Sequence, residues 1–216
     1  AGAVWLWPAA KTLELVGDVE GLGLLQAAKA AGKGVLVIAP HFGNWEILGL
    51  YLNVCGCGQS SQLYQAPESP ALAKLIYQAR SRCGAHMVNT DTKGVAELLK
   101  TLRRGEIVGM LPDQVPPPSG GEFAPFFGVP ALTMTLLNRL QQKTGAAVVI
   151  GYARRVEGGF RIVFRAAAAG IESADPGTGL AALNQCVELT ALDAIEQYQW
   201  EYKRFKRQPD GVSPPY

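Results

Sequence analysis

Short apolar runs alternate with amphipathic stretches along much of the chain. Residues 34–39 and 107–111 are aliphatic runs, each closed by a proline, and this pattern is typical of strands buried on both faces of a parallel sheet. The segments between such runs carry apolar residues at helical spacing. The alternation predicts an α/β fold with a mostly parallel sheet flanked by helices and right-handed crossovers.

The same pattern gives the expected order of elements. We expect helices over residues 23–31, 45–52, 69–83, 92–104, 132–144 and 179–197, and strands over residues 34–39, 63–65, 86–88, 107–111, 147–152 and 160–165. The last two strands form an antiparallel hairpin at one edge of the sheet. Residues 115–121 are rich in Pro and Gly and predict a surface loop that continues into the aromatic segment 123–128. Residues 198–206 either extend the last helix or begin another.

Polar residues follow both proline-terminated strands. His41 comes directly after the first, and Glu46 lies in the first turn of the helix that Asn44 caps. Asp113–Gln114 follows the second strand. Ligands of open α/β sheets bind beyond the carboxyl ends of the strands, so we expect these side chains along one edge of the sheet.

His41 is the candidate catalytic base. An imidazole both accepts and returns protons near neutral pH, and we expect the carboxylate of Glu46 to orient it. The loop contains no Ser or Cys to act as a covalent nucleophile, so the simplest chemistry is activation of a hydroxyl of the substrate. The alternative is a structural histidine hydrogen-bonded to its own loop.

Composition narrows the class of protein. The 216 residues, 48% hydrophobic and 18% charged, are sufficient for one sizeable core, and a net charge of +2 gives no argument for nucleic acid. The four cysteines form no CxxC pair and the two histidines no HExxH motif, so we expect reduced thiols, no metal site and no cofactor. No apolar run reaches the 18 or so residues of a membrane span. The basic cluster 203–207 either contacts phosphate or an anionic membrane, or is a solvated helical face.

Four separated motifs carry a resemblance to a known family. They are Ala39–Glu46 (APHFGNWE), Leu102–Glu106 with Pro112–Gln114 (LRRGE and PDQ), Phe123–Gly128 (FAPFFG) and Gln197–Lys206 (QYQWEYKRFK), and they run in order along the chain. In this set the chain resembles the late acyltransferases of lipid A biosynthesis, the lauroyl/myristoyl acyltransferases, within the HxxxxD/E acyltransferase superfamily.

The resemblance implies a function and its partners. It implies transfer of an acyl chain from acyl carrier protein to a hydroxyacyl group of a lipid A precursor, at the cytoplasmic face of the inner membrane. It further implies a single acyltransferase domain over residues 1–216 that lacks the N-terminal membrane anchor of the family. Where many members have Tyr-Arg after the second strand, this chain has Tyr64-Gln65.

The resemblance also assigns roles to residues. His41 would be the general base and Glu46 would orient it, while Arg80 and Asp113 would complete the polar site with Gln114. Arg82 is the neighbouring alternative to Arg80. Further candidates for substrate binding are two aromatic and two basic residues: Phe126, Phe127, Arg204 and Lys206. The phenylalanines either line an acyl groove or pack on the core.

Three other functions remain open from sequence. One is an acyltransferase of the same superfamily that acts on another glycolipid, such as a phosphatidylinositol mannoside. The second is a catalytically inactive protein that binds the membrane surface. The third is a soluble hydrolase.

Overall fold

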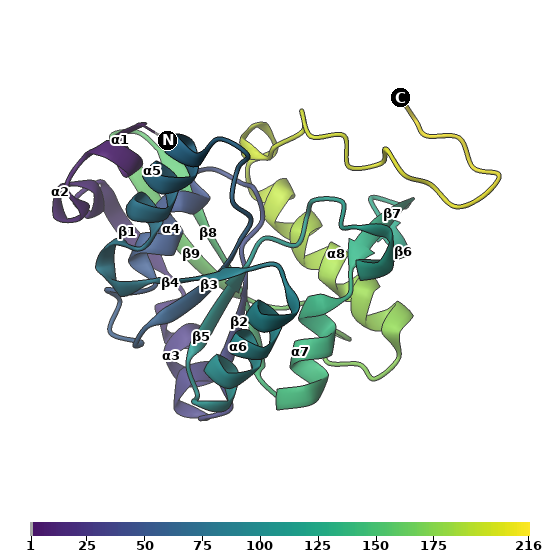
Figure 1. The fold of residues 1–216 in the computed structure, drawn as a ribbon, viewed down its shortest axis with the longest axis horizontal. Coiled ribbons are helices and arrows are strands. Elements are labelled where there is room, and N and C mark those ends of the chain that lie inside the picture. The colour runs from purple at the N-terminus through teal and green to yellow at the C-terminus, as the bar shows by residue number, and fades with distance from the viewer. Residues whose placement is uncertain (1) are drawn as a thin grey trace.

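The computed structural model describes residues 2–216 and contains a seven-stranded sheet with helices on both faces and a separate two-stranded hairpin (Figure 1). The strand order in the large sheet is β1-β9-β8-β2-β5-β3-β4. Its strands are β1 Val16–Glu20, β2 Val35–Ile38, β3 Ser60–Tyr64, β4 His86–Asn89, β5 Ile107–Met110, β8 Ala147–Val156 and β9 Gly159–Ala166. The hairpin consists of β6 Gly121–Phe126 and β7 Val129–Met134.

Eight α-helices and three 3₁₀ turns are described. The helices are α1 Gly2–Leu6, α2 Ala9–Leu13, α3 Leu22–Ala30, α4 Trp45–Tyr51, α5 Pro70–Arg80, α6 Thr92–Arg103, α7 Leu136–Thr144 and α8 Pro176–Asp193. The turns are η1 Arg82–Gly84, η2 Pro118–Gly120 and η3 Ile195–Gln197. Across residues 2–216, none of the helices combines the length and the apolar character that a membrane crossing requires.

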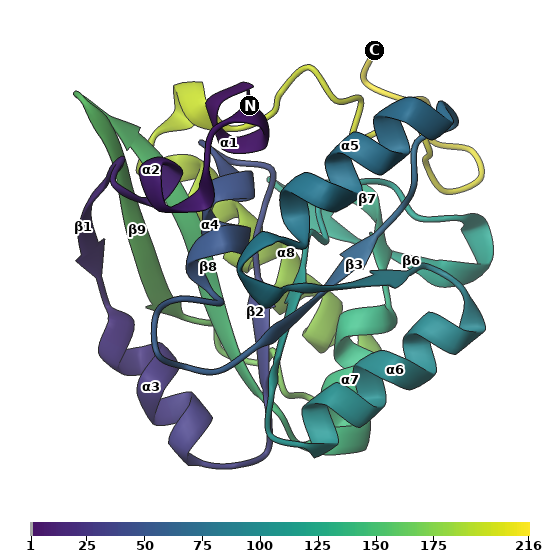
Figure 2. The same ribbon diagram turned by 60° about the vertical axis from the view of Figure 1, so that its left-hand side comes forward.

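The central strands explain why the two faces form separate cores. Alternate residues of β2 point to opposite sides: Leu36 and Ile38 pack with α6, α7 and α8, whereas Val35 and Val37 pack with α3 and α4. Figure 2 shows α3 and α6 on opposite sides of β2. All four residues of β2 and all four of β5 are buried, as expected for strands covered on both faces.

β2 and β5 are parallel neighbours in register. Val35 is paired with Ile107 and Ile38 with Met110. Each strand ends at a proline two residues later, so the chain leaves the sheet at two adjacent points of its carboxyl edge. The predicted α/β class and mostly parallel sheet are thereby confirmed, and both proline-terminated strands are where the sequence predicted them.

The structure corrects four details. The predicted hairpin, β8–β9, is antiparallel, but β1 pairs with β9 outside it, so the hairpin is not the last element at that edge. Segment 123–128 is not a surface loop, because residues 123–126 belong to β6 and residues 127–128 form its turn into β7. The predicted helix 132–144 begins only at Leu136, because its first residues belong to β7. Residues 198–206 are not helical.

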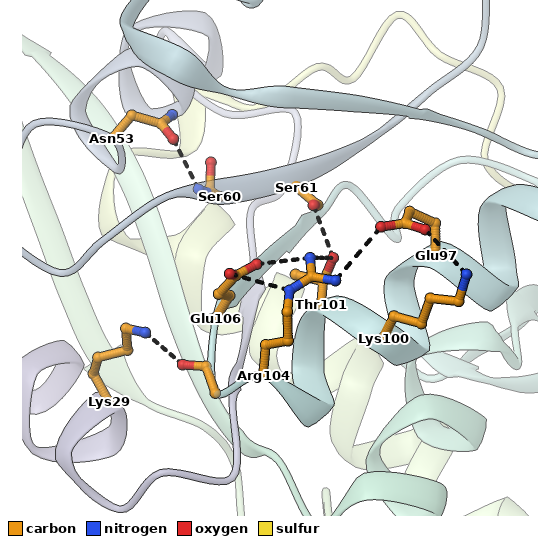
Figure 3. A network of polar contacts seen from close by, with 10 residues as sticks. Lys29, Asn53, Ser60, Ser61, Glu97, Lys100, Thr101, Arg104 and Glu106 are labelled. Atoms are coloured by element: carbon orange, nitrogen blue, oxygen red, sulfur yellow. Dashed lines mark hydrogen bonds and ion pairs between the residues drawn. The ribbon is translucent and has the colours of Figure 1, made fainter.

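A polar network joins several elements at the opposite, amino end of β5 (Figure 3). Arg104 forms ion pairs with Glu106 at 2.9 Å and with Glu97 of α6 at 3.7 Å. Lys29 of α3 donates to the carbonyl oxygen of Gly105. These contacts fix the turn from α6 into β5, which is the strand whose other end leads to Asp113.

Candidate active site

The loop that carries His41 is tied to the neighbouring strand β8. Gly43 has φ +56°, and a Cβ atom at this position would lie 2.0 Å from the carbonyl oxygen of Ala153. The backbone N–H of Asn44 donates to that same oxygen at 2.9 Å. Only glycine fits here, because the loop requires both a left-handed conformation and close backbone contact. Asn44 precedes α4 as predicted, although its side chain makes no capping hydrogen bond.

Asp113 holds His41 with both carboxylate oxygens. Its Oδ1 lies 2.8 Å from His41 Nδ1, and its Oδ2 accepts the His41 backbone N–H at 2.8 Å. The Asp113 side chain is 2% exposed and that of His41 14%. An ionised carboxylate only accepts hydrogen bonds, so the neutral imidazole carries its proton on Nδ1 and presents the lone pair of Nε2.

Gln114 occupies the other side of the imidazole. Its Nε2 lies 3.3 Å from His41 Nε2, a distance typical of a weak hydrogen bond from the amide to the ring. The carboxyl edge of the sheet therefore brings His41 together with Asp113 and Gln114, as the sequence predicted. The Trp45 ring packs edge-on against the imidazole, with 5.3 Å between the ring centroids.

Glu46 has a different partner from the one expected. Its carboxylate accepts hydrogen bonds from Arg80 Nε at 2.9 Å and from Arg80 Nη2 at 2.7 Å. The Arg80 guanidinium also lies over the rings of Trp45 and Tyr64, 4.8 and 5.6 Å from their centroids. The expectation that Glu46 orients His41 is wrong: the bidentate ion pair holds Glu46, and Asp113 orients the imidazole.

Arg82, the alternative to Arg80, is remote from this ion pair. Its guanidinium donates to the backbone carbonyl oxygens of Val4 and Trp7 in the N-terminal region. Arg80 is therefore the arginine that belongs to the site.

A narrow cavity of about 30 Å³ adjoins the ion pair, large enough for about one water molecule. Its wall is mainly apolar and comes from α4 and the strands beneath it. The lining residues are Ala39, Trp45, Glu46, Leu48, Gly49, Leu52, Gln62, Leu63, Arg80, Met87, Gly109 and Leu111.

Residues 197–204, here called the C-terminal strap, pack against the His41 loop. The Gly43 N–H donates to the carbonyl oxygen of Gln197 at 2.9 Å, and the Gln199 N–H donates to that of His41 at 3.0 Å. The Tyr202 hydroxyl accepts the backbone N–H of Val115 at 2.9 Å. The strap thus contacts the loops after both β2 and β5. Sequence reasoning missed this role, because an irregular segment held by distant backbone groups has no periodicity.

Arg204 is not available at the surface. It is 5% exposed, and its guanidinium donates to the Leu132 carbonyl oxygen at 2.6 Å and to Thr133 Oγ1 at 3.0 Å. Burial lowers the pKa of this guanidinium below its usual value. The expectation that Arg204 binds lipid phosphate or a carrier protein is wrong, because its donors are used inside the protein. Lys206 is exposed, so its proposed role stays a prediction.

The two phenylalanines have different environments. Phe126 is 1% exposed and packs near Tyr198 and Phe205, with ring centroids 6.3 and 5.9 Å away. Phe127, at the tip of the β6–β7 hairpin, is 39% exposed and lies 5.8 Å from the Trp200 ring. Phe126 is thus a packing residue, whereas Phe127 presents an apolar ring to solvent beside the strap.

The geometry suits proton transfer by His41. Within residues 2–216, no group of three or more His, Cys, Asp or Glu side chains is arranged to hold a metal ion. The reactive group that the geometry presents is the imidazole, which can accept a proton at Nε2 while Asp113 stabilises the resulting imidazolium.

Comparison with known proteins places the chain in a family. The model of the bacterial lipid A biosynthesis acyltransferases matches residues 1–207. The lipid A biosynthesis palmitoleoyltransferase of Escherichia coli is 30% identical over 221 aligned residues, which cover 100% of this chain and 69% of that protein. The lauroyltransferase of the same organism is 28% identical over 218 residues, covering 100% and 70%. A Haemophilus influenzae lipid A biosynthesis acyltransferase is 29% identical over 221 residues, covering 99% and 68%.

The family match over residues 1–207 includes all four motifs and both members of the His41–Asp113 pair. The chain belongs to the bacterial lipid A biosynthesis acyltransferase family and is an acyltransferase.

Proposed function

We propose that the protein transfers a fatty acyl chain from acyl carrier protein to a hydroxyacyl group of a lipid A precursor, with His41 as general base. The observation that carries the proposal is the His41–Asp113 pair at the carboxyl edge of β2 and β5. The pair fixes the tautomer that a base requires, and its Nε2 faces away from Asp113. Family membership supports the acceptor class.

The proposed reaction is a direct transfer. Nε2 of His41 removes the proton of the acceptor hydroxyl as the hydroxyl oxygen attacks the carbonyl carbon of the thioester. The C–S bond of the tetrahedral intermediate then breaks, and the imidazolium returns its proton to the departing thiolate. An ester and a free carrier thiol result, and no residue of the protein is acylated.

Two neighbours of the imidazole affect this reaction. Asp113 stabilises the imidazolium through its short contact with Nδ1, which makes the proton transfer more favourable. Gln114 occupies the position next to Nε2 that the acceptor hydroxyl must reach, so its amide has to move aside when the acceptor binds. The Glu46–Arg80 pair forms part of the wall of the adjoining cavity, which is also lined by Trp45, the residue whose ring packs against His41.

The location of the reaction follows from the chemistry of the acceptor. A lipid acceptor places the enzyme at a membrane surface, and the proposed site is the cytoplasmic face of the inner membrane, where acyl carrier protein is available. Phe127 and Lys206 are exposed near the strap and are candidates for contact with lipid or carrier protein.

The test follows the acyl group. The protein is incubated with acyl carrier protein that carries a labelled acyl chain, together with a lipid A precursor in mixed micelles. Label in the lipid A product is the expected result. Label released as free fatty acid would indicate a hydrolase, label in a different glycolipid when total membrane lipids are offered would indicate another acceptor, and no turnover by the folded protein would contradict an active transferase.

A further inference from the structure

A second cavity lies between the β6–β7 hairpin and the segment that follows the strap. Its volume is about 730 Å³, within the range of about 300 to 1,000 Å³ that is typical of small-ligand sites. The hairpin contributes one part of the lining, and residues 206–214 contribute another. Figure 1 shows the C-terminal segment, in yellow, passing beside β6 and β7. This cavity shares no lining residue with the narrow one beside the Glu46–Arg80 pair.

The lining combines apolar side chains with two cations. Phe123 of β6 is 41% exposed and lines the cavity together with Leu132 of β7. Lys206 and Arg207 are exposed members of the same lining. Neither cation forms an ion pair with a carboxylate of residues 2–216. Lys206 Nζ lies over the Tyr202 ring, 4.9 Å from its centroid, and a neutral ring leaves the positive charge of the ammonium in place.

These cations favour an anionic ligand of a particular kind. One carboxylate, that of Glu122, also belongs to the lining, so two positive charges and one negative charge leave a net charge of +1. A phosphate monoester carries a charge of about −1.5 to −2 at neutral pH and gains from this surplus. The guanidinium of Arg207 can bind two phosphate oxygens at once, and Lys206 supplies a point charge. The apolar side chains suit the sugar face or the first methylene groups of a glycolipid.

The cavity is linked to the catalytic histidine through the strap. Lys206 contacts the Tyr202 ring, and the Tyr202 hydroxyl accepts the backbone N–H of Val115 at 2.9 Å. Val115 follows Gln114, whose amide lies 3.3 Å from His41 Nε2. A ligand in the cavity is therefore separated from the imidazole by the strap and the loop after β5, and it does not touch the reacting atoms.

We propose that this cavity binds a phosphate group of the glycolipid acceptor, while the hydroxyacyl chain extends past the strap to His41. The inference rests on the proposed function and deepens it by naming the part of the acceptor that is recognised. The other anionic partner is the carrier protein. A protein partner buries about 800 Å² of each surface, whereas these cations line a concave site of small-ligand size.

The experiment measures KM for the acceptor with saturating acyl carrier protein, using a phosphorylated lipid A precursor in mixed micelles. The double variant Lys206→Gln with Arg207→Gln removes both cations from the lining. We expect its KM for the acceptor to rise about tenfold, and its kcat and its KM for the carrier protein to stay within about twofold of wild type. Unchanged acceptor KM, or a raised KM for the carrier protein instead, would overturn the inference.

Two further variants test the sign and the place of the charge effect. Glu122→Gln removes the repulsive carboxylate, so KM for the acceptor should fall about twofold. Lys93→Gln with Arg103→Gln makes the same change of charge on α6, where both side chains are exposed and neither lines the cavity. This control should leave the acceptor KM as in wild type. An equal rise in the control would mean that net charge, and not the cavity, sets the affinity.

Removing the phosphate from the acceptor completes the test. With precursor that a phosphatase has dephosphorylated, wild type and the Lys206→Gln, Arg207→Gln variant should have the same KM, because the group that the cations bind is gone. A tenfold difference that persists would overturn the inference. Equilibrium binding of the phosphorylated precursor without donor keeps the inference separate from the proposed function. Weaker binding by the double variant supports the site, whereas failure of the proposed function would appear as wild-type protein that transfers no label to lipid A.

Discussion

Glu46 and Arg80 provide a prediction at the scale of single residues. The Glu46 side chain is 6% exposed and that of Arg80 18%, and three hydrogen-bond contacts of 2.7 to 3.2 Å join them. Removing one member of a buried ion pair leaves an uncompensated charge. We expect Glu46→Gln to lower the free energy of unfolding by about 2 to 3 kcal/mol, less than for a fully buried pair because Arg80 is partly hydrated. Urea denaturation measures this difference.

The control for this prediction is the double variant Glu46→Gln with Arg80→Met. It removes both charges and keeps an unbranched side chain over the Trp45 ring, so part of the lost stability should return. If the single and double variants were equally destabilised, the ion pair would not be the cause. The same proteins also separate a structural role of Glu46 from a catalytic one. If the double variant regains stability and also transfers the acyl chain, the role of Glu46 is structural.

At the scale of elements, the β2–α4 loop depends on the glycine at its centre. Gly43→Ala places a methyl group 2.0 Å from the Ala153 carbonyl oxygen and imposes a left-handed conformation that costs a non-glycine residue about 1 to 2 kcal/mol. We expect the variant to lose transfer activity and to melt at a lower temperature, because the loop must leave β8. Thermal unfolding and the transfer assay together measure this.

Gly56→Ala is the matched control. Gly56 also has positive φ, +81°, but no atom lies within 4 Å of the position of its Cβ. The two variants share the conformational cost, and only Gly43→Ala has the clash. Equal effects on transfer would show that close contact with β8 is not what positions His41.

The elements also show why part of the architecture was predictable. Residues 34–39 and 107–111 encode buried strands in their own composition, and the following prolines mark where they end, so the meeting of His41 and Asp113 could be inferred. The β6–β7 hairpin could not, because Pro125 and Pro130 argue against strands. They are tolerated opposite each other since both strands of a two-stranded sheet are edges, where a missing N–H costs little.

The partner of Glu46 and the strap could not be predicted for a different reason. Arg80 lies 34 residues from Glu46, and the strap is held by backbone groups of the His41 loop. Both contacts join residues that are far apart in the chain, so no periodicity or short motif in the sequence indicates them. Nearness in the motif suggested Glu46 as the partner of His41, whereas tertiary structure supplied Asp113, 72 residues away.

For the whole molecule, the buried tyrosines predict instability in alkali. Tyr152 and Tyr198 both have pKa values raised above the ordinary value of 10.0, chiefly by burial. Above about pH 10 the unfolded chain loses these protons and the folded protein keeps them, so the folded state binds more protons and stability falls as pH rises. The free energy of unfolding from urea titrations between pH 8 and pH 11 should be constant at first and then decrease.

Tyr152→Phe tests the origin of this decrease. The variant removes one of the buried groups whose pKa is raised in the folded protein, so its stability should fall less steeply above pH 10 than that of wild type. Identical slopes would mean that other groups cause the alkaline loss.

The central claim concerns the whole enzyme: His41, held by Asp113, removes the proton from a lipid hydroxyl. The most direct measurement is the rate of label transfer from acyl carrier protein to a lipid A precursor by His41→Ala, with His86→Ala as control because His86 is the other histidine and is exposed on β4. We predict a loss of about two to four orders of magnitude for His41→Ala and none for His86→Ala. Transfer at the wild-type rate by a folded His41→Ala protein would contradict the account.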